Sequence, residues 1–194
     1  MENFQVKISY SKRRTLLIIV KDCCVFVKAP LRTRIEKINN FLIKKRSWIE
    51  NAIAKQEKNK LLLENFKQRG EVLLFGVTTS VNKYNEECDL ATSFVERIFW
   101  EFVVLYKFSV YELSFGNAKT VWGTCTANNR VRLNKKLIML PKELIEYVII
   151  HELVHTVHHN HSRLFWNGVK KICPNCSALR KALKDYSWVL GCDV

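Results

Sequence analysis

The pattern of apolar and polar positions changes along the first half of the chain. The first thirty residues contain the apolar runs FQVKISY, TLLIIV and VFVKAP, which are separated by the polar segments SKRR and KDCC. Short alternating or β-branched runs between turn-forming residues are typical of strands, so this region is predicted to form a small antiparallel meander. From Thr33 to about Phe66 the apolar residues recur at helical spacing, which predicts a helix. Residues 71–84, EVLLFGVTTSVNKY, predict a hairpin that turns at Gly76.

In the second half, long helices and short strands are expected to alternate. Asp89 is a favourable helix N-cap, and it precedes the apolar segment LATSFVERIFWEFVVLYKF, which predicts a largely buried helix. The segment KTVWGTCTANNRVRLN predicts two strands that are joined at its NN turn. Pro141 suits the first turn of a helix that runs through KELIEYVIIHELVHTVHH. Two shorter helices, at 162–172 and 176–190, are expected to complete the chain.

These elements predict an α+β protein in two parts. The first part, residues 1–88, is expected to be a β-rich lobe with a helix, and the second part, residues 89–194, is expected to hold the remaining helices around a small sheet. With 194 residues, of which 48% are hydrophobic, the chain is long and apolar enough to build a core. Disorder is therefore not the expected state.

The charge of the chain is strongly basic and unevenly distributed. The net charge is +14, and residues 1–60 contain 15 Lys and Arg against 5 Asp and Glu. Such a surface favours an anionic partner such as nucleic acid or a nucleotide, although a solvated basic face without a partner explains the same charge. The segments SKRR and KKRSWIE place charge near Trp48, but they contain no base-reading motif. Contact with phosphates, independent of base sequence, is the most that these segments support.

The number of cysteines and the hydropathy of the chain indicate the cellular compartment in which the protein is expected. The chain contains seven cysteines, an odd number, and its N-terminal region lacks the apolar core and cleavage site of a signal peptide. The apolar run TLLIIV is much shorter than the roughly 20 residues that span a bilayer. We therefore expect a reduced, cytoplasmic protein without a membrane segment.

All five histidines lie in HELVHTVHHNH, residues 151–161. His151 and His155 are four positions apart, so on a helix they share one face and can bind the same metal ion. In an H-E-x-x-H arrangement the glutamate, here Glu152, is not a ligand but takes the proton of a metal-bound water. Zinc lowers the pKa of such a water from about 15.7 to about 7, which supplies hydroxide at neutral pH.

A catalytic zinc site needs a third protein ligand and one position that remains open. The candidates are His158, His159 and His161. His158 lies on roughly the same face as His155, but it would have to reach along the helix axis. His161 is better placed if the helix ends near Asn160, because Asn tolerates the left-handed conformation that reverses a chain. The predicted zinc (Zn²⁺) ligands are therefore His151, His155 and His161, with His158 as the fallback.

Two cysteine features are weaker metal candidates. Cys173 and Cys176 form a C-x-x-C pair that resembles half of a zinc ribbon, but the sequence has no second pair. Cys125 precedes the histidine segment and is a candidate thiolate ligand or nucleophile. We interpret Cys125 as a small buried residue and the C-x-x-C pair as a chance spacing.

Several longer segments resemble the YgjP-like metallopeptidases, which are related to the SprT-type zinc proteases. The similar segments are VWGTC, RVRLNKKLIMLPKELIEYVIIHELVH, NHSRLFW and CPN, and the opening YSKRRTLLIIV…VFVKAPLRTRIEKINNFLIKKRSWI resembles the family's N-terminal region. The resemblance implies a zincin-like core in which the H-E-x-x-H helix packs on a small sheet. It also implies zinc on His151, His155 and His161 and a general base at Glu152.

The resemblance further implies a framework and cleft wall for the site. The matching positions are Trp122, Gly123, Cys125, Arg132, Leu133 and Asn134. The chain departs from the family at Val121, where an arginine usually precedes the tryptophan, so any role of that arginine is absent or has moved here.

The function that follows from these features is hydrolysis of an amide bond in a protein or peptide substrate by a zinc metallopeptidase. Two alternatives use the same site. The family resemblance also implies a nucleoside triphosphate pyrophosphatase, whose anionic substrate would suit the net charge of +14. A DNA-associated module with a structural zinc is the second alternative, but a structural site has no use for Glu152 beside its ligands.

Overall fold

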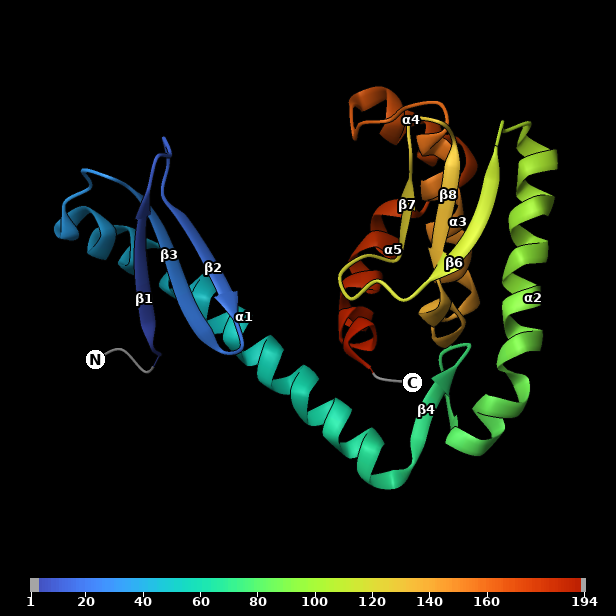
Figure 1. The fold of residues 1–194 in the computed structure, drawn as a ribbon, viewed down its shortest axis with the longest axis horizontal. Coiled ribbons are helices and arrows are strands. Elements are labelled where there is room, and N and C mark those ends of the chain that lie inside the picture. The colour runs from blue at the N-terminus through green and yellow to red at the C-terminus, as the bar shows by residue number, and fades with distance from the viewer. Residues whose placement is uncertain (1–3, 193–194) are drawn as a thin grey trace. The chain divides into compact units, whose positions relative to one another are not determined.

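The structure is a computed structural model that describes residues 4–192 (Figure 1). The chain divides into two compact units, Met1–Glu64 and Asn65–Val194, which are described separately. The boundary that the sequence predicts between residues 88 and 89 lies within a helix, Val81–Tyr106.

The first unit contains a three-stranded sheet and most of a long helix. The strands are β1 (Val6–Ser11), β2 (Leu17–Lys21) and β3 (Cys24–Pro30), in the order β1-β3-β2. β2 and β3 are antiparallel and are joined at Asp22 and Cys23, whose φ angles are both positive. β1 pairs with β3 in parallel, so the sheet is mixed and the predicted antiparallel meander is wrong in this pairing. β3 is central because its alternate residues Val25, Val27 and Ala29 are fully buried, whereas β1 is largely exposed.

Helix α1 (Ile35–Arg69) covers the buried face of this sheet and agrees closely with the predicted helix. Ile38, Leu42 and Ile49 are buried in one cluster with the inward residues of β3. Gln56 fastens the helix to the hairpin, because its side chain donates to the Val20 carbonyl at 2.8 Å and accepts from the Cys23 amide at 3.0 Å. The apolar stripe thus sets the face of the helix, and one amide side chain fixes the hairpin against it.

The second unit contains a hairpin, a three-stranded sheet and the remaining helices. The hairpin strands are β4 (Glu71–Leu74) and β5 (Val77–Ser80), and the sheet strands are β6 (Glu112–Gly116), β7 (Gly123–Cys125) and β8 (Arg130–Asn134). The helices are α2 (Val81–Tyr106), α3 (Lys142–His155), α4 (Arg163–Ile172) and α5 (Cys176–Leu183), with 3₁₀ helices η1 (Lys135–Met139) and η2 (Lys184–Gly191). The predicted turn at Gly76 is confirmed: Phe75 and Gly76 both have positive φ, as a two-residue hairpin turn requires.

Helix α2 begins earlier than the sequence predicts. Its N-cap is Ser80, whose hydroxyl oxygen accepts from the Lys83 amide at 3.3 Å, and Asp89 lies inside the helix. The prediction of an N-cap at Asp89 is therefore wrong. Residues 81–88 are mostly polar and have a single buried side chain, Tyr84, so they lack the apolar spacing that predicts the rest of the helix from Ala91 onwards.

The sheet of the second unit has β8 at its centre, parallel to β6 and antiparallel to β7. The predicted strand pair is confirmed, and Asn129, at the NN turn, has a φ of 56°. Asn134 holds the loop that leads into β7, because its side-chain amide donates to the carbonyls of Ala118 at 2.7 Å and Val121 at 2.9 Å. The sheet therefore presents a β7 edge of fixed position.

Helix α3 is the central helix of the second unit and packs against α2, α4, α5, β7 and β8 (Figure 1). Nine of its fourteen residues are buried: Leu144, Ile145, Tyr147, Val148, Ile149, Ile150, Glu152, Leu153 and Val154. A helix that is apolar all round belongs to a core, which explains the rigid position of the motif that it carries. Within residues 4–192, no helix combines the length and the apolar character that crossing a membrane requires.

Candidate metal centre

The helix that carries the histidine segment ends sooner than predicted. α3 stops at His155, and Thr156 closes it by donating its hydroxyl to the Leu153 carbonyl at 2.7 Å. The prediction that the helix continues to Asn160 and reverses there in a left-handed conformation is wrong, because Asn160 does not have a positive φ. Asn160 instead accepts the Ser162 amide on its side-chain oxygen at 3.2 Å, a local turn that leads the chain into α4.

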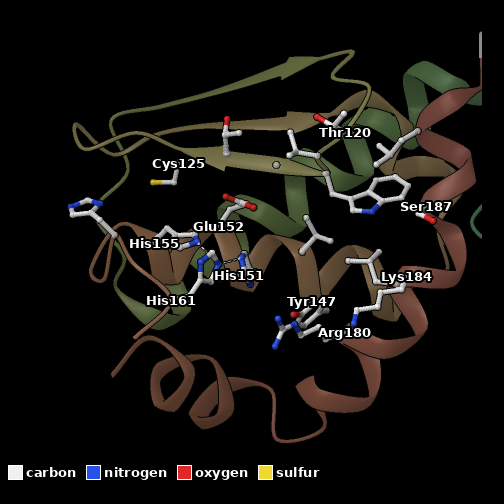
Figure 2. A pocket seen from close by; sticks show the side chains of 18 residues that line it. Thr120, Cys125, Tyr147, His151, Glu152, His155, His161, Arg180, Lys184 and Ser187 are labelled. Atoms are coloured by element: carbon white, nitrogen blue, oxygen red, sulfur yellow. Dashed lines mark hydrogen bonds between the residues drawn. The ribbon is translucent and has the colours of Figure 1, made fainter. Parts of the chain in front are cut away.

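The early end of α3 brings three histidines together (Figure 2). The Nε2 atom of His161 lies 3.0 Å from Nε2 of His151 and 3.2 Å from Nε2 of His155. Two nitrogens at Zn–N distances of about 2.0–2.1 Å in a tetrahedron are separated by about 3.3–3.4 Å. Both distances are close to this value, and the three donor atoms all lie within 4.8 Å of one another, so they can share a single ion. Of the His, Cys, Asp and Glu residues in the described part of the chain, these three form the group that could hold a metal.

The Nδ1 atoms of His151 and His155 indicate which ring nitrogen of each histidine is free to bind a metal ion. Nδ1 of His155 lies 3.0 Å from the His158 carbonyl oxygen, so it carries the proton and leaves Nε2 unprotonated. Nδ1 of His151 is buried and has no hydrogen-bond partner among the described residues. Burial lowers the pKa of His151 to about 3, with further lowering from His155, His161 and Arg180. His151 is thus a neutral imidazole at pH 7, the form that binds metal ions.

Two aromatic residues of α4 support the histidine rings. Phe165 is fully buried and stacks on His155 at a centroid distance of 4.3 Å, and it meets His151 edge-on at 4.9 Å. Trp166 stacks on His161 with a centroid distance of 5.7 Å and an interplanar angle of 27°. Because His161 itself is exposed, this stacking and the turn before α4 hold its ring toward the other two.

Glu152 lies on the β7 side of the histidines and is not part of the nitrogen cluster (Figure 2). Its side chain is buried, and burial raises the pKa of its carboxyl to about 7. Gly123 leaves the space that this side chain fills: a Cβ at residue 123 would lie 2.6 Å from Cγ and 2.9 Å from Oε1 of Glu152. The glycine of the WG-x-C segment is therefore required by close contact with the glutamate.

The histidines and Glu152 face a cavity of about 610 Å³. Its walls come from the loop before β7, from β7, α3, α5 and η2, and from the segment between α3 and α4. They include Thr120, Val121, Trp122, Gly123, Thr124, Cys125, Tyr147, Val148, His159, Arg180, Leu183, Lys184, Ser187 and Leu190. The predicted cleft-wall positions Trp122, Gly123 and Cys125 thus line it, whereas His158 does not. The cavity gives a substrate room beside the candidate metal ligands.

Several polar residues of this cavity were not identified from the sequence, among them Tyr147, Arg180 and Lys184. Tyr147 lies one helical turn before His151, so the four-residue spacing that joined His151 to His155 also pointed to it. Burial raises the pKa of the Tyr147 hydroxyl to about 12, so the hydroxyl is protonated at neutral pH and can donate a hydrogen bond. Arg180 and Lys184 come from the last helices, and no motif marked them.

The cysteine candidates do not join the metal cluster. Cys125 lines the cavity, but burial and the nearby Glu152 raise the pKa of its thiol to about 11, and the thiol donates to the Thr126 carbonyl at 3.5 Å. Cys173 and Cys176 are both buried, and the Cys173 thiol lies 3.1 Å from the Asn175 side-chain oxygen. None of these three cysteines belongs to a group of three metal-binding side chains among residues 4–192.

Comparison with known proteins gives a match over most of the chain. The family model of the YgjP-like metallopeptidase domain matches residues 13–97 and 84–186. The chain is also similar to the metallopeptidase zymogen of Pyrococcus abyssi abylysin, with 20% identity and a TM-score of 0.42 over 46% of this chain and 90% of that chain. The jannalysin zymogen of Methanocaldococcus jannaschii is 22% identical, with a TM-score of 0.40 over 46% and 92%. No curated protein matches the chain.

Proposed function

The chain belongs to the YgjP-like metallopeptidase family, and we propose that it is a zinc peptidase with His151, His155 and His161 as ligands and Glu152 as general base. The observation that carries this proposal is the convergence of three histidine Nε2 atoms at 3.0 and 3.2 Å. Three nitrogen donors beside a cavity suit a catalytic zinc, since a structural site has four protein ligands and no access. When bound, zinc would polarise the substrate carbonyl and acidify water.

Glu152 would act as the general base and then as the general acid in this reaction. Its carboxylate lines the same cavity as the three candidate ligands but lies outside the nitrogen cluster. There it can accept a proton from the attacking water and deliver it to the amine nitrogen that leaves. Gly123 and the burial of Glu152 restrict the carboxylate to one place, which is what proton transfer in the transition state requires.

The cavity favours an amide substrate over a phosphoanhydride. β7 lines the cavity and is an edge strand, so one side of its backbone pairs with no other described strand. An extended peptide can add to such an edge through main-chain hydrogen bonds, whereas a nucleotide cannot. The apolar wall residues Val121, Leu183 and Leu190 suit the side chains of a peptide. These features support a protein or peptide substrate.

Metal analysis and parallel hydrolysis assays test the proposed function. The purified protein is expected to contain stoichiometric zinc and to cleave an unfolded protein, but not nucleoside triphosphates, in assays run side by side. A chelator should abolish the cleavage, and added zinc should restore it. Removal of zinc should also lower the Tm, because zinc binds to the folded protein more tightly than to the unfolded chain. Protein that lacks zinc, or that hydrolyses nucleoside triphosphates alone, would contradict the proposal.

Gly123→Ala is expected to lower kcat about 100-fold without loss of zinc. The new Cβ would lie 2.6 Å from Cγ of the buried Glu152, so the carboxylate must move from its place. The measurement is kcat for a peptide substrate together with the zinc content of the purified variant.

A double variant separates this displacement from a general loss of structure. Glu152→Asp shortens the acidic side chain and leaves room for the alanine. It should therefore lower kcat much less in the Gly123→Ala background than in the wild type. If the two changes lower kcat additively, Gly123 does not act through Glu152.

A further inference from the structure

Two positive side chains line the cavity and are not used in the proposed reaction. Arg180 lies on α5 and Lys184 begins η2, and no carboxylate within residues 4–192 forms an ion pair with either. We infer that Arg180, assisted by Lys184, forms a subsite that binds a carboxylate of the peptide substrate. This inference rests on the proposed peptidase function and adds a substrate preference to it.

Arg180 is held close to the candidate metal ligands. Its guanidinium lies over the Trp166 ring, 4.5 Å from the centroid, and the same ring stacks on His161. The guanidinium and a candidate ligand thus contact the same indole ring, so the subsite lies within about three residue lengths of the scissile bond. The charge of Arg180 also acts on Tyr147, where it opposes the rise in pKa that burial causes. Figure 2 draws Tyr147, Arg180 and Lys184 along one side of the cavity.

The chemistry of the two side chains suits a carboxylate. A guanidinium presents donors in a planar fork that matches the two oxygens of a carboxylate, and stacking on an aromatic ring leaves this fork available. Lys184 adds a second, more mobile charge one helical turn further along the chain. Glu152 is the sole acidic residue among the described residues that line the cavity, so an anionic substrate group meets a surplus of positive charge.

The apolar wall beside the two cationic side chains favours a peptide carboxylate over a triphosphate. A nucleoside triphosphate carries about four negative charges at neutral pH, counted from its phosphate pKa values. Arg180, Lys184 and a bound zinc ion would offset that charge, but the wall near the two side chains contains Leu183 and Leu190, which offer a polyanion no polar contacts. A single carboxylate of a peptide, flanked by apolar side chains, fits this combination better. Its source is either a Glu or Asp side chain or the C-terminal carboxylate.

A peptide series with one variable position tests the subsite. Quenched fluorescent peptides would be identical except for Glu, Gln or Lys at one place, which is moved across three residues on each side of the cleaved bond. A second set would compare a free C-terminus with an amidated one, to distinguish the two sources of the carboxylate. The variants are Arg180→Glu, Arg180→Gln and the control Lys181→Glu, which changes an exposed charge on the same helix outside the cavity.

The expected result is a charge preference that depends on Arg180. Wild type and Lys181→Glu should prefer the carboxylate peptide by about tenfold in kcat/KM at one position. Arg180→Glu should reverse this preference toward Lys, and Arg180→Gln, which keeps the side chain polar and uncharged, should remove it. Equal zinc content in all variants separates the subsite from metal binding. A preference that survives in a zinc-loaded Arg180 variant, or its absence in the wild type, would overturn the inference.

Binding measurements keep this result distinct from failure of the proposed function. Calorimetry with zinc-loaded Glu152→Gln should give the same Arg180-dependent preference in Kd without any cleavage. Absence of peptide cleavage by the wild type would count against the peptidase, while this preference in Kd would still support the subsite. Binding of a nucleoside triphosphate that depends on Arg180, without a preference for carboxylate peptides, would overturn the carboxylate assignment.

Discussion

Glu152→Gln is expected to lower kcat about 10²–10⁴-fold while the protein keeps its zinc. Glutamine has nearly the same shape as glutamate, so it fills the space that Gly123 leaves and preserves the packing of α3 against β7. Its amide cannot accept the proton of the attacking water. The chemistry should therefore fail while the three histidines remain in place, and the measurements are kcat on a cleavable peptide, zinc content and Tm.

Glu146→Gln is the matched control for this variant. Glu146 lies on the same helix but outside the cavity, so the same chemical change should leave kcat and zinc content near those of the wild type. Full activity in Glu152→Gln would exclude this residue as the general base. Loss of zinc from Glu152→Gln would assign it a role in holding the metal, contrary to the geometry of the three nitrogens.

His161→Ala is expected to weaken zinc binding by more than 100-fold, beyond the roughly 10–100-fold loss that follows removal of an outer hydrogen-bond partner of a ligand. The variant leaves two nitrogens, from His151 and His155, which cannot complete a three-ligand site. Because the His161 side chain is exposed, its removal should cost little stability in the metal-free protein. Zinc titration against a competing chelator, together with Tm with and without zinc, measures both effects.

His158→Ala and His159→Ala are the controls that distinguish the candidate third ligands. His158 contributes its backbone carbonyl to His155, which an alanine retains, and His159 lies outside the three-nitrogen cluster. Both variants should keep zinc affinity within a few-fold of the wild type. If His158→Ala loses zinc and His161→Ala retains it, the fallback ligand is the correct one.

Local signals in the sequence predicted several elements well. The apolar stripe of α1, the Phe75–Gly76 hairpin turn and the NN turn before β8 each depend on residues close in the sequence, and each was predicted. The failures involve interactions at longer range or weak local signals. The parallel pairing of β1 with β3 depends on which strand becomes buried, and the first turns of α2 lack an apolar pattern.

At the end of α3, the structure brings together the predicted third ligand and the other two histidines, but the backbone conformation on which that prediction depended is wrong. The sequence predicts His161 as the third ligand on the premise that Asn160 reverses the chain in a left-handed conformation. The structure instead ends the helix at His155 and turns the chain through the Asn160 side chain. His161 still meets His151 and His155, because the short segment before α4 leads back across the helix end and Trp166 supports the ring.

The sequence by itself determined the candidate donors of the centre: an H-E-x-x-H pattern on a predicted helix and a histidine six residues later. Such features are local, since helical periodicity fixes which side chains share a face. Only the tertiary structure decided that Gly123 makes room for Glu152 and that Arg180 and Lys184 enter the same cavity. Residues far apart in the sequence meet there because α3 is buried on several sides and packs against β7, α4 and α5. No local sequence pattern determines which side chains of these elements then face each other.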